Sequence, residues 1–386
     1  MSQSFRPMHR RFWTPGVLIM AAFMLAGAVA VVARYSGGLG YVTNLDQTHP
    51  WGLWIGIDVV TGVALAAGGF TTAALAHIFG RRFYESITRP ALLTAVLGYT
   101  FVGVGLFFDI GRSWAFWKPL FFQNHQSALF EVAMCVFCYT VVLYIELLPI
   151  VCERFKERFP FLQTLHRQLD RVIWVFIILG VVLSCMHQSS LGTLMLVAPT
   201  KVHPLWYTPV LPLLFLLSAI AVGYPMVVVE SSLINASLKQ KPETHILAPL
   251  VRIAVVVLGV YLGIKIADMF IRGTQVHLFT GTAQSNAFLL EMLLGVILPF
   301  VLLCFRSVRR SPRWLFIASL AVVLGVILNR VNVFLIGYMP QSAAKPYWPA
   351  AGEFALTLGC AAALMFVYRL AVNYLPILPS AEEEAV

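Results

Sequence analysis

Residues 17–32, VLIMAAFMLAGAVAVV, form an apolar run without a charged side chain. The run is longer than the hydrophobic region of a usual signal peptide, and the ARYSGG after it is a poor cleavage site. We therefore expect it to be retained as a membrane-spanning helix. The whole chain has the same character, because 59% of its 386 residues are hydrophobic and 11% are charged, against about 25% charged in soluble proteins. The composition predicts an all-α integral membrane protein.

About ten apolar runs are long enough to cross the roughly 30 Å of hydrocarbon in a bilayer. The connections between them are short and carry the polar, Pro or Gly residues typical of loops. We therefore expect residues 1–386 to form a single polytopic membrane domain. The fifth run has a short apolar stretch. The expected spans are 14–34, 53–79, 90–110, 127–151, 171–190, 209–235, 247–270, 287–305, 313–336 and 351–373.

Lysine and arginine residues predict the orientation of the chain. Ten spans put both ends of the chain on one side, and the basic residues then gather on that side, for example at 154–171 and 306–313. The positive-inside rule makes this side cytoplasmic. The net charge of +10 is thus explained by topology, and it gives no reason to expect a nucleic-acid partner.

Ionisable residues inside the spans are the main indication of function. A charged side chain at the centre of a bilayer costs about 2.5–3.5 kcal/mol on insertion scales, so such residues usually have a role. For three of them, near the outer ends of their spans, we favour interfacial positions or internal ion pairs, and these are Asp268, Glu291 and Glu353. The remaining candidates are Asp58, Asp109, Glu131, Glu146, Glu230 and Arg330.

The stretch CMHQSSLGTLM at 185–195 places His187 at the end of an apolar run. At about 1.5 Å per residue along the fifth span, His187 falls in the outer third of the membrane. Glu131 begins the fourth span on that side, and Asp109 and Arg112 lie at the end of the third. An acid, a base and hydrogen-bond donors from three helices are thus expected at one depth. This coincidence favours a functional site over a histidine that only satisfies a helix end.

A lipid-accessible pocket with these groups would suit a quinone. A quinone has two carbonyl oxygens, an apolar ring and an isoprenoid tail, and its reduction takes up two electrons and two protons. A histidine and a carboxylate can hold the carbonyl oxygens and relay protons. The electrons would come from a partner subunit, because we find no ligand set for a redox metal in this chain.

Three further residues suggest a proton route. Glu146 lies fifteen residues after Glu131, which places the two about 22 Å apart and only about 60° apart around one helix. Tyr99 is expected near the middle of the third span, and Glu230 near the cytoplasmic end of the sixth. Protonatable groups at outer, middle and inner depths suit proton transfer, provided that helix packing turns them toward one another.

The histidines and cysteines argue against a bound metal. A transmembrane b-type haem usually needs two facing histidines, and only His77 and His187 fall clearly within spans, near opposite faces. Cys135 and Cys138 form a single CxxC without a second pair or a following histidine, whereas an iron–sulfur cluster needs about four ligands. We therefore expect the six cysteines to be small buried hydrophobes, and no haem or iron–sulfur cluster in this chain.

Several stretches resemble the NrfD/PsrC family of quinone-interacting membrane anchors, and within it the ten-span members that serve hydrogenases of the [NiFe]-hydrogenase-2 (HybB) type. The pair MHQSSLGTLM (186–195) and KVHPLW (201–206) is the most specific, and residues 236–350 match more loosely. The other matching stretches are PWGLWIGIDVVTGVALAAGGF (50–70), RPALLTAVLGYTFVGVGLFFDIGR (89–112), LFEVAMC (129–135), VVVESSL (227–233) and LPILP (375–379).

This resemblance implies two four-helix bundles plus two additional helices in a bacterial cytoplasmic (inner) membrane. It implies menaquinone or ubiquinone as substrate in a haem-free pocket near the outer face. It also implies a ferredoxin-like iron–sulfur subunit and a catalytic [NiFe]-hydrogenase subunit as partners. On this basis the quinone site would include His187, Glu131, Asp109 and Arg112, and proton transfer would involve Tyr99 and Glu230, with weaker family support for Glu146.

Other functions remain open at this point. Relatives of such anchors serve molybdenum oxidoreductases and sulfur-metabolism complexes. A proton-coupled transporter would use the same buried acids without redox partners, and it would be expected to show an inverted repeat with broken helices. A purely structural anchor would tolerate neutral replacements of its intramembrane acids.

Overall fold

The computed structural model describes residues 5–8, 11–238, 242–343 and 345–379. In these ranges, ten helical segments are long and apolar enough to cross a membrane, and two isolated β-bridges are present in place of strands. The predicted all-α membrane fold with ten spans is therefore confirmed. Seven spans are single α-helices: α1 (Pro15–Gly37), α5 (Glu85–Asp109), α7 (Ala128–Phe155), α8 (Pro160–Leu196), α9 (Leu211–Leu238), α10 (Thr244–Ile271) and α15 (Ala351–Tyr374).

The other three spans each contain at least one stretch of π-helix, a wider helix that is frequent at functional sites. The second span consists of η1 (Trp54–Thr61), α3 (Gly62–Leu65), α4 (Gly68–Ala73) and η2 (Ala74–Ile78). The eighth consists of α11 (Ala283–Leu290), η6 (Glu291–Ile297) and α12 (Leu298–Cys304), and the ninth of α14 (Pro312–Val331) and η7 (Asn332–Ile336). Short helices lie in the connections: α2 (Leu39–Val42), η3 (Arg82–Tyr84), η4 (Ser113–Ala115), α6 (Lys118–Phe121), η5 (Thr274–His277) and α13 (Arg306–Arg310).

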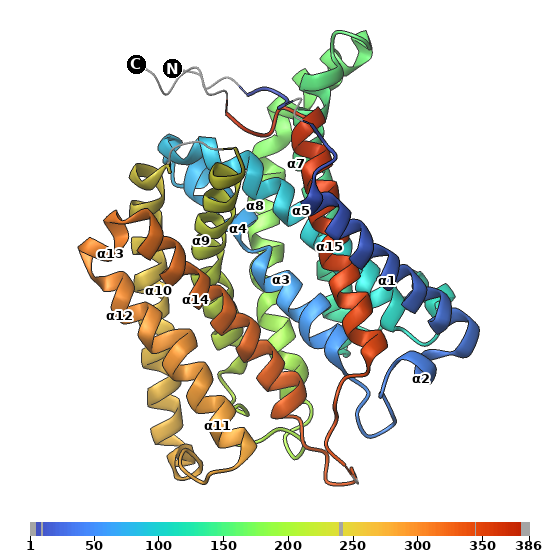
Figure 1. The fold of residues 1–386 in the computed structure, drawn as a ribbon, viewed down its shortest axis with the longest axis vertical. Coiled ribbons are helices and arrows are strands. Elements are labelled where there is room, and N and C mark those ends of the chain that lie inside the picture. The colour runs from blue at the N-terminus through green and yellow to red at the C-terminus, as the bar shows by residue number, and fades with distance from the viewer. Residues whose placement is uncertain (1–4, 9–10, 239–241, 344, 380–386) are drawn as a thin grey trace.

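Helix α8 starts earlier than the sequence predicts. We expected the fifth span to begin at residue 171, whereas the helix runs for 37 residues from Pro160, or about 55 Å. Proline at the first helical position favours this start, because its missing N–H has no partner there in any helix. Hydropathy misses the first turns because they are polar and extend past the apolar stretch. With α7 they form a hairpin that projects beyond the neighbouring helices (Figure 1).

The ten spans pack as two four-helix bundles and a pair of outlying helices (Figure 1). The second to fifth spans form the first bundle, in which α7 and α8 pack closely and α5 packs against both α4 and α7. The sixth to ninth spans form the second bundle, in which α9 packs against α10 and α14. Helices α1 and α15 form the terminal pair and pack mainly against each other, with α15 also touching α5. This is the arrangement that the family resemblance implies.

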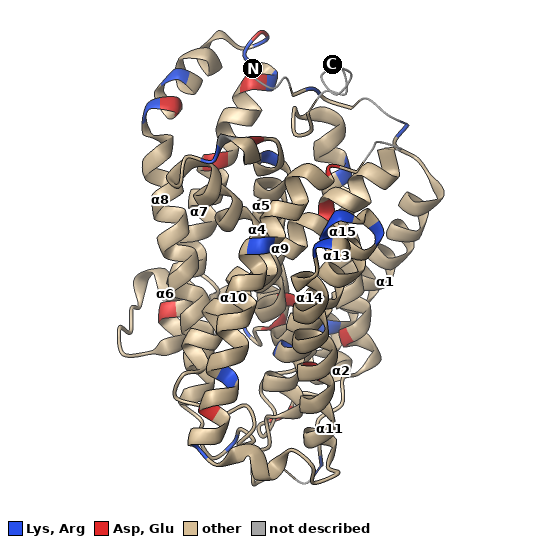
Figure 2. Cartoon of the chain, turned by 90° about the vertical axis from the view of Figure 1, so that its left-hand side faces the viewer, with Lys and Arg blue, Asp and Glu red and all other residues tan. Residues whose placement is uncertain are grey.

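Helix α1 begins and α15 ends at the same end of the molecule (Figure 1), as an even number of spans requires. Phe5 and Pro379 pair in an antiparallel β-bridge there. We call this the inner end and the opposite one the outer end. Figure 2 shows long stretches of helix without Lys, Arg, Asp or Glu between the two ends, as expected for spans. That the inner end is cytoplasmic remains a prediction.

Glycine pairs set two of the closest helix crossings. A Cβ added at Gly295 would lie 2.5 Å from Cα of Gly325, so η6 and α14 cross with their backbones in contact. A Cβ at Gly27 would lie 3.0 Å from Cα of Gly359, where α1 crosses α15. Small residues permit this approach in membranes, where hydrophobic burial does not drive helix association.

Candidate functional site

His187 lies in a sealed position in the first bundle. Its side chain is 0% exposed. Nδ1 is hydrogen bonded to the carbonyl oxygen of Leu183 at 2.7 Å, and Nε2 to the hydroxyl of Tyr99. Because a carbonyl only accepts, Nδ1 of a neutral imidazole donates and Nε2 accepts from Tyr99. Two predicted residues, one expected at a quinone and one on a proton route, are therefore direct partners.

His187 lies deeper than the sequence estimate placed it. Nine residues separate it from the end of α8 at Leu196, a rise of about 13 Å. Its partner Tyr99 is ten residues from the end of α5 at Asp109. The histidine is thus close to mid-height of the bundle and not beside the outer surface, because α8 continues beyond the apolar run that we used to set the depth.

Aromatic and polar side chains surround His187. The ring centroids of Tyr99 and Tyr139 lie 5.3 and 5.4 Å from that of His187, and 4.6 Å from each other. Gln188 donates to the carbonyl oxygen of Val63 at 2.9 Å and thereby ties α8 to α3. The Tyr139 hydroxyl and the Gln188 Oε1 atom are buried without a partner of good hydrogen-bond geometry among the described residues. Buried polar groups normally have partners, often water, so this centre has spare hydrogen-bonding capacity.

Glu131 lies in the first turn of α7 and its side chain is exposed. Its Oε1 atom accepts a hydrogen bond of 2.6 Å from Ser190, which lies one turn after His187 on α8. Glu131 and His187 are therefore close to the same stretch of α8, as predicted, but they are not bonded to each other. Glu131 accepts from Ser190, and His187 accepts from Tyr99. The carboxylate faces the outer end, and the imidazole is enclosed below it.

Asp109 and Arg112 belong to different surroundings. Asp109 is half-buried, and its Oδ1 atom has no hydrogen-bond partner among the described residues. Nearby, Arg34 of α1 donates to the carbonyl oxygens of Phe108 at 2.8 Å and Ile110 at 2.7 Å, and so closes the end of α5. Arg112 is exposed. These groups gather where α5 meets the terminal pair, and no described hydrogen bond joins them to His187.

The two remaining predicted acids lie toward the inner end. Glu146 faces α8, where its Oε1 atom approaches Gly180, and it lines a small hollow together with Tyr139. Tyr139 and Glu146 are two turns apart on α7, about 10 Å along the axis. Tyr139 therefore lies between His187 and Glu146. Glu230 accepts a hydrogen bond of 2.7 Å from Tyr368 of α15, and so joins the second bundle to the terminal pair.

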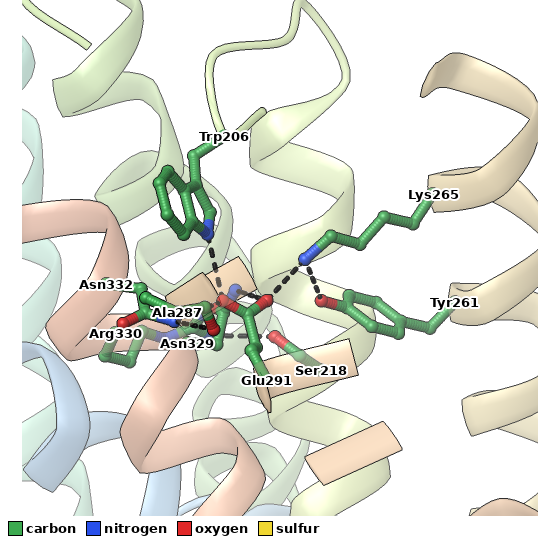
Figure 3. A network of polar contacts seen from close by, with 9 residues as sticks. All are labelled: Trp206, Ser218, Tyr261, Lys265, Ala287, Glu291, Asn329, Arg330 and Asn332. Carbon is green, nitrogen blue, oxygen red and sulfur yellow. Dashed lines mark hydrogen bonds and ion pairs between the residues drawn. The ribbon is translucent and has the colours of Figure 1, made fainter. Parts of the chain in front are cut away.

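A second polar centre fills the interior of the second bundle (Figure 3). Glu291 is 0% exposed and accepts four hydrogen bonds. Lys265 at 2.5 Å and Asn329 at 2.8 Å donate to Oε1. Trp206 at 2.9 Å and Asn332 at 2.8 Å donate to Oε2. The expectation that Glu291 forms an internal ion pair is confirmed. Its partner Lys265 was overlooked, although it stands alone within an apolar run, which was the available signal.

Asp268 and Glu353, for which we also expected interfacial positions or internal ion pairs, have partners close by. Asp268 pairs with Arg272 at 2.8 Å and accepts from Thr208. Glu353 accepts from the backbone of Asn44 and Leu53 at the start of the second span. The expected ion pair is confirmed for Asp268. The expectation is wrong for Glu353, which is 0% exposed and forms no ion pair among the described residues, because backbone N–H groups satisfy its carboxylate instead.

Arg330 completes the second centre (Figure 3). It is fully buried, and its guanidinium donates to Asn329 Oδ1 and Ser218 Oγ, both at 2.8 Å, and to the carbonyl oxygen of Phe215 at 3.1 Å. Asn329 thus bridges the arginine to Glu291. The network joins four spans and holds η6 and η7 at their first residues, so its first role is to fix the second bundle.

A larger hollow of about 720 Å³ lies at the outer end, between the start of η1, the end of η7 and the first turn of α15. Its lining includes His49, which lies between the first and second predicted spans. None of the predicted site residues is among those that line this hollow.

Ten spans in two bundles, with a buried histidine–tyrosine pair in the first, define a multi-pass membrane protein of a known architecture. The family model described as "Polysulphide reductase, NrfD" matches residues 41–340. The chain therefore belongs to the NrfD family.

Three relatives match almost the whole chain. A Nitratidesulfovibrio vulgaris protein whose name states no function is 37% identical over 96% of both chains. The probable Ni/Fe-hydrogenase 2 b-type cytochrome subunit of Escherichia coli (strain K12) is 32% identical over 98% of this chain and 96% of its own. The integral membrane subunit of a menaquinone reductase of N. vulgaris is 27% identical over 96% of this chain and 92% of its own.

A b-type haem, which the name of the E. coli relative suggests, does not fit the residues around His187. Axial ligation needs a free ring nitrogen, but Nδ1 and Nε2 of His187 are engaged by Leu183 and Tyr99. His77, the other predicted span histidine, is exposed at the inner end of the second span.

Proposed function

We propose that this chain is the quinone-reactive membrane subunit of a respiratory oxidoreductase complex in a bacterial cytoplasmic membrane. A ferredoxin-like iron–sulfur subunit would exchange electrons with it, and a [NiFe]-hydrogenase would be the catalytic subunit. Membership of the NrfD family and the names of the E. coli and N. vulgaris relatives support the proposal. Menaquinone or ubiquinone is then the substrate in the lipid phase.

The observation that carries the proposal is the hydrogen bond between His187 and Tyr99 in a fully buried setting. Reduction of a quinone takes up two protons with its two electrons, so a quinone-reactive protein needs acid–base groups within the bilayer. A neutral imidazole that accepts from a phenol can take up that proton and return it, and general acid–base groups of this kind typically accelerate reactions by about 10²–10⁴-fold. A purely structural anchor has no need of an ionisable group here.

The neighbouring acids extend this pair into a column along α7 and α8. Glu131 with Ser190 stands at the outer end, His187 with Tyr99 at mid-height, and Glu146 below Tyr139. The spare hydrogen-bonding capacity around Tyr139 suits water molecules that would bridge the steps of about 10 Å. In this scheme His187 exchanges protons through Tyr99 and does not itself contact a quinone oxygen. This role agrees with the complete burial of the His187 side chain.

Quinone-linked turnover by the purified complex tests the proposal. His187→Ala and Glu131→Gln are expected to abolish turnover, because each removes a proton acceptor from the column. His77→Ala and Glu157→Gln, two exposed positions at the inner end, are the matched controls and should keep it. Wild-type turnover in both His187→Ala and Glu131→Gln, at equal assembly of the complex, would refute the assignment.

Glu230 tests whether protons cross the membrane. If protons for the quinone come from the inner end, each elementary charge moved stores about 2.3 kcal/mol per 100 mV. Glu230→Gln would then lower quinone-linked charge movement in reconstituted vesicles, since the carboxylate that accepts from Tyr368 is lost. Equal charge movement in wild type and Glu230→Gln would exclude this residue from the route.

The identity of the catalytic partner subunit needs a separate test. The hydrogenase relative covers nearly the full chain at 32% identity, which favours a hydrogenase over a molybdenum or sulfur-metabolism enzyme. Mass spectrometry of the intact complex would identify the partner subunits. A molybdenum subunit in their place would overturn the hydrogenase assignment and leave the quinone function standing.

A further inference from the structure

The outer hollow of about 720 Å³ is built by distant parts of the chain. Leu53, directly before η1, and Ile57 of η1 line it, together with Val331 and Leu335 of the ninth span and Phe354 of α15. It therefore lies where the first bundle, the second bundle and the terminal pair meet. Binding pockets for small molecules typically have volumes of about 300–1,000 Å³, so the hollow is large enough for a substituted bicyclic ring.

Residues 336–340 form one wall of this hollow, which we call its roof. The KVHPLW motif (201–206), to which the proposed function assigns no role, holds this roof in place. The backbone N–H of Met339 donates to the carbonyl oxygen of Lys201 at 2.6 Å, and that of His203 to Gly337 at 2.8 Å. Val202 and Tyr338 form a β-bridge between the same two segments. The roof is thus tied to the loop after α8 by several backbone contacts, and its shape is part of the fold.

The lining is mostly apolar, and its polar members include Gln284, Lys345 and the imidazole of His49, whose orientation is fixed. Nδ1 of His49 lies 3.0 Å from the Thr48 hydroxyl and 3.5 Å from Asp46 Oδ1. This leaves Nε2 as the ring nitrogen available to a ligand. The rings of Tyr347 and Tyr338 lie 6.0 and 6.4 Å from that of His49. A flat aromatic ligand with a polar oxygen at its edge fits these surroundings.

Asp46 links His49 to the outer aqueous phase. Its side chain is 59% exposed, whereas that of His49 is 6% exposed. Hydrogen bonds from the Thr48 hydroxyl and from the backbone N–H of His49 lower the pKa of Asp46 to about 2. The carboxylate is therefore ionised at neutral pH and favours an Nδ1–H that points toward it.

We propose that this hollow is the seat of the quinone ring, with Nε2 of His49 hydrogen bonded to one carbonyl oxygen and the isoprenoid tail leaving between the spans. The inference rests on the proposed function, since it presumes a quinone-reactive complex. It places the ring at the junction of the bundles and not against His187. The second span connects the two centres, because Ile57 lines the hollow and Val63, six residues further on, is held by Gln188.

Photoaffinity mapping on the intact complex in lipid nanodiscs tests this seat. The probe is an azido-naphthoquinone with one isoprenoid unit, and the competitor is the same naphthoquinone without the azide. We expect labelled peptides from residues 44–57 and 331–339, with labelling abolished by competitor. Ala283→Trp, which fills the hollow from α11, should lower labelling at least fivefold. Ala351→Trp, at the first position of α15 and outside the lining, is the matched control.

His49→Ala gives a second measure that does not depend on filling the hollow. It should raise the KM for the naphthoquinone at least fivefold with little change in kcat, because a binding contact is lost and the proton column is intact. His77→Ala, at the inner end of the second span, should leave both constants unchanged.

The outcomes separate the seat from the proposed function. Competed labelling confined to residues 128–196, or labelling that competitor does not reduce, would overturn the seat while quinone turnover stands. An unchanged KM in both His49→Ala and Ala283→Trp would also overturn it. A wild-type complex that neither turns over nor binds the naphthoquinone would refute the proposed function itself.

Discussion

The two bundles each bury a polar centre below their outer end, and the two centres are built in opposite ways. In the first bundle His187 has a single side-chain hydrogen bond, to Tyr99, and the nearby Tyr139 hydroxyl has no partner of good geometry among the described residues. In the second bundle Glu291 accepts four hydrogen bonds and a cation lies 2.5 Å away. The Glu291 carboxylate is thus held by four donors, although Arg330 Nε and Asn332 Oδ1 of the same network have no partner among the described residues. The neutral His187–Tyr99 pair can instead exchange a proton within itself.

This contrast indicates a different role for each centre. A buried carboxylate is tolerated when donors surround it, and such a network then fixes the packing of the helices that supply the donors. A buried neutral imidazole that donates to a carbonyl through one ring nitrogen and accepts from a phenol through the other can take up the proton of that phenol and return it. The contrast supports the proposed proton transfer in the first bundle and a structural role for the Glu291 network in the second.

The largest effect is expected from Lys265→Met, which removes the cation beside Glu291. Breaking a buried ion pair on one side costs about 3–5 kcal/mol. The melting temperature of the purified complex should therefore fall sharply. The double variant Lys265→Met/Glu291→Gln should recover part of the loss, since Gln keeps an acceptor and carries no charge. If Lys265→Met alone is as stable as wild type, the Glu291 network does not stabilise the second bundle, and the proposed difference between the two centres fails.

A pair of leucine substitutions compares the centres directly. Asn332→Leu takes one donor from the Glu291 carboxylate, and a hydrogen bond to a charged group contributes about 1.5–3 kcal/mol. Gln188→Leu removes a neutral hydrogen bond to Val63, with an expected cost of about 1 kcal/mol. Unfolding of both variants in the same detergent gives the ranking. Equal losses, or a larger loss for Gln188→Leu, would contradict the structural role of the Glu291 network in the second bundle.

Gly295→Ala tests how tightly the second bundle is packed. The added methyl would meet the Gly325 backbone at 2.5 Å, and overpacking of this kind costs about 1–3 kcal/mol. Gly103→Ala in α5, where a Cβ has no neighbour within 4 Å, is the control and should be neutral or slightly stabilising. The comparison is made by thermal unfolding, and a neutral Gly295→Ala would mean that η6 and α14 can separate at no cost.

Hydropathy predicted the ten spans well because length and apolar content are local properties. It misplaced the start of α8, since the turns after Pro160 are polar and carry no membrane signal. Counting charges in spans found Glu291 but passed over Lys265, although both are needed to explain the site. Which groups meet depends on helix rotation and crossing, which explains why Asp109 was expected beside His187 and lies instead at the terminal pair.

The rate of quinone-linked turnover in Tyr99→Phe tests the central claim most directly. The variant keeps the ring and removes only the hydroxyl bonded to His187, at a stability cost of about 1 kcal/mol. The account predicts a fall of about a hundredfold in turnover per assembled complex, with Asn332→Leu near the wild-type rate. Wild-type turnover in Tyr99→Phe would contradict it.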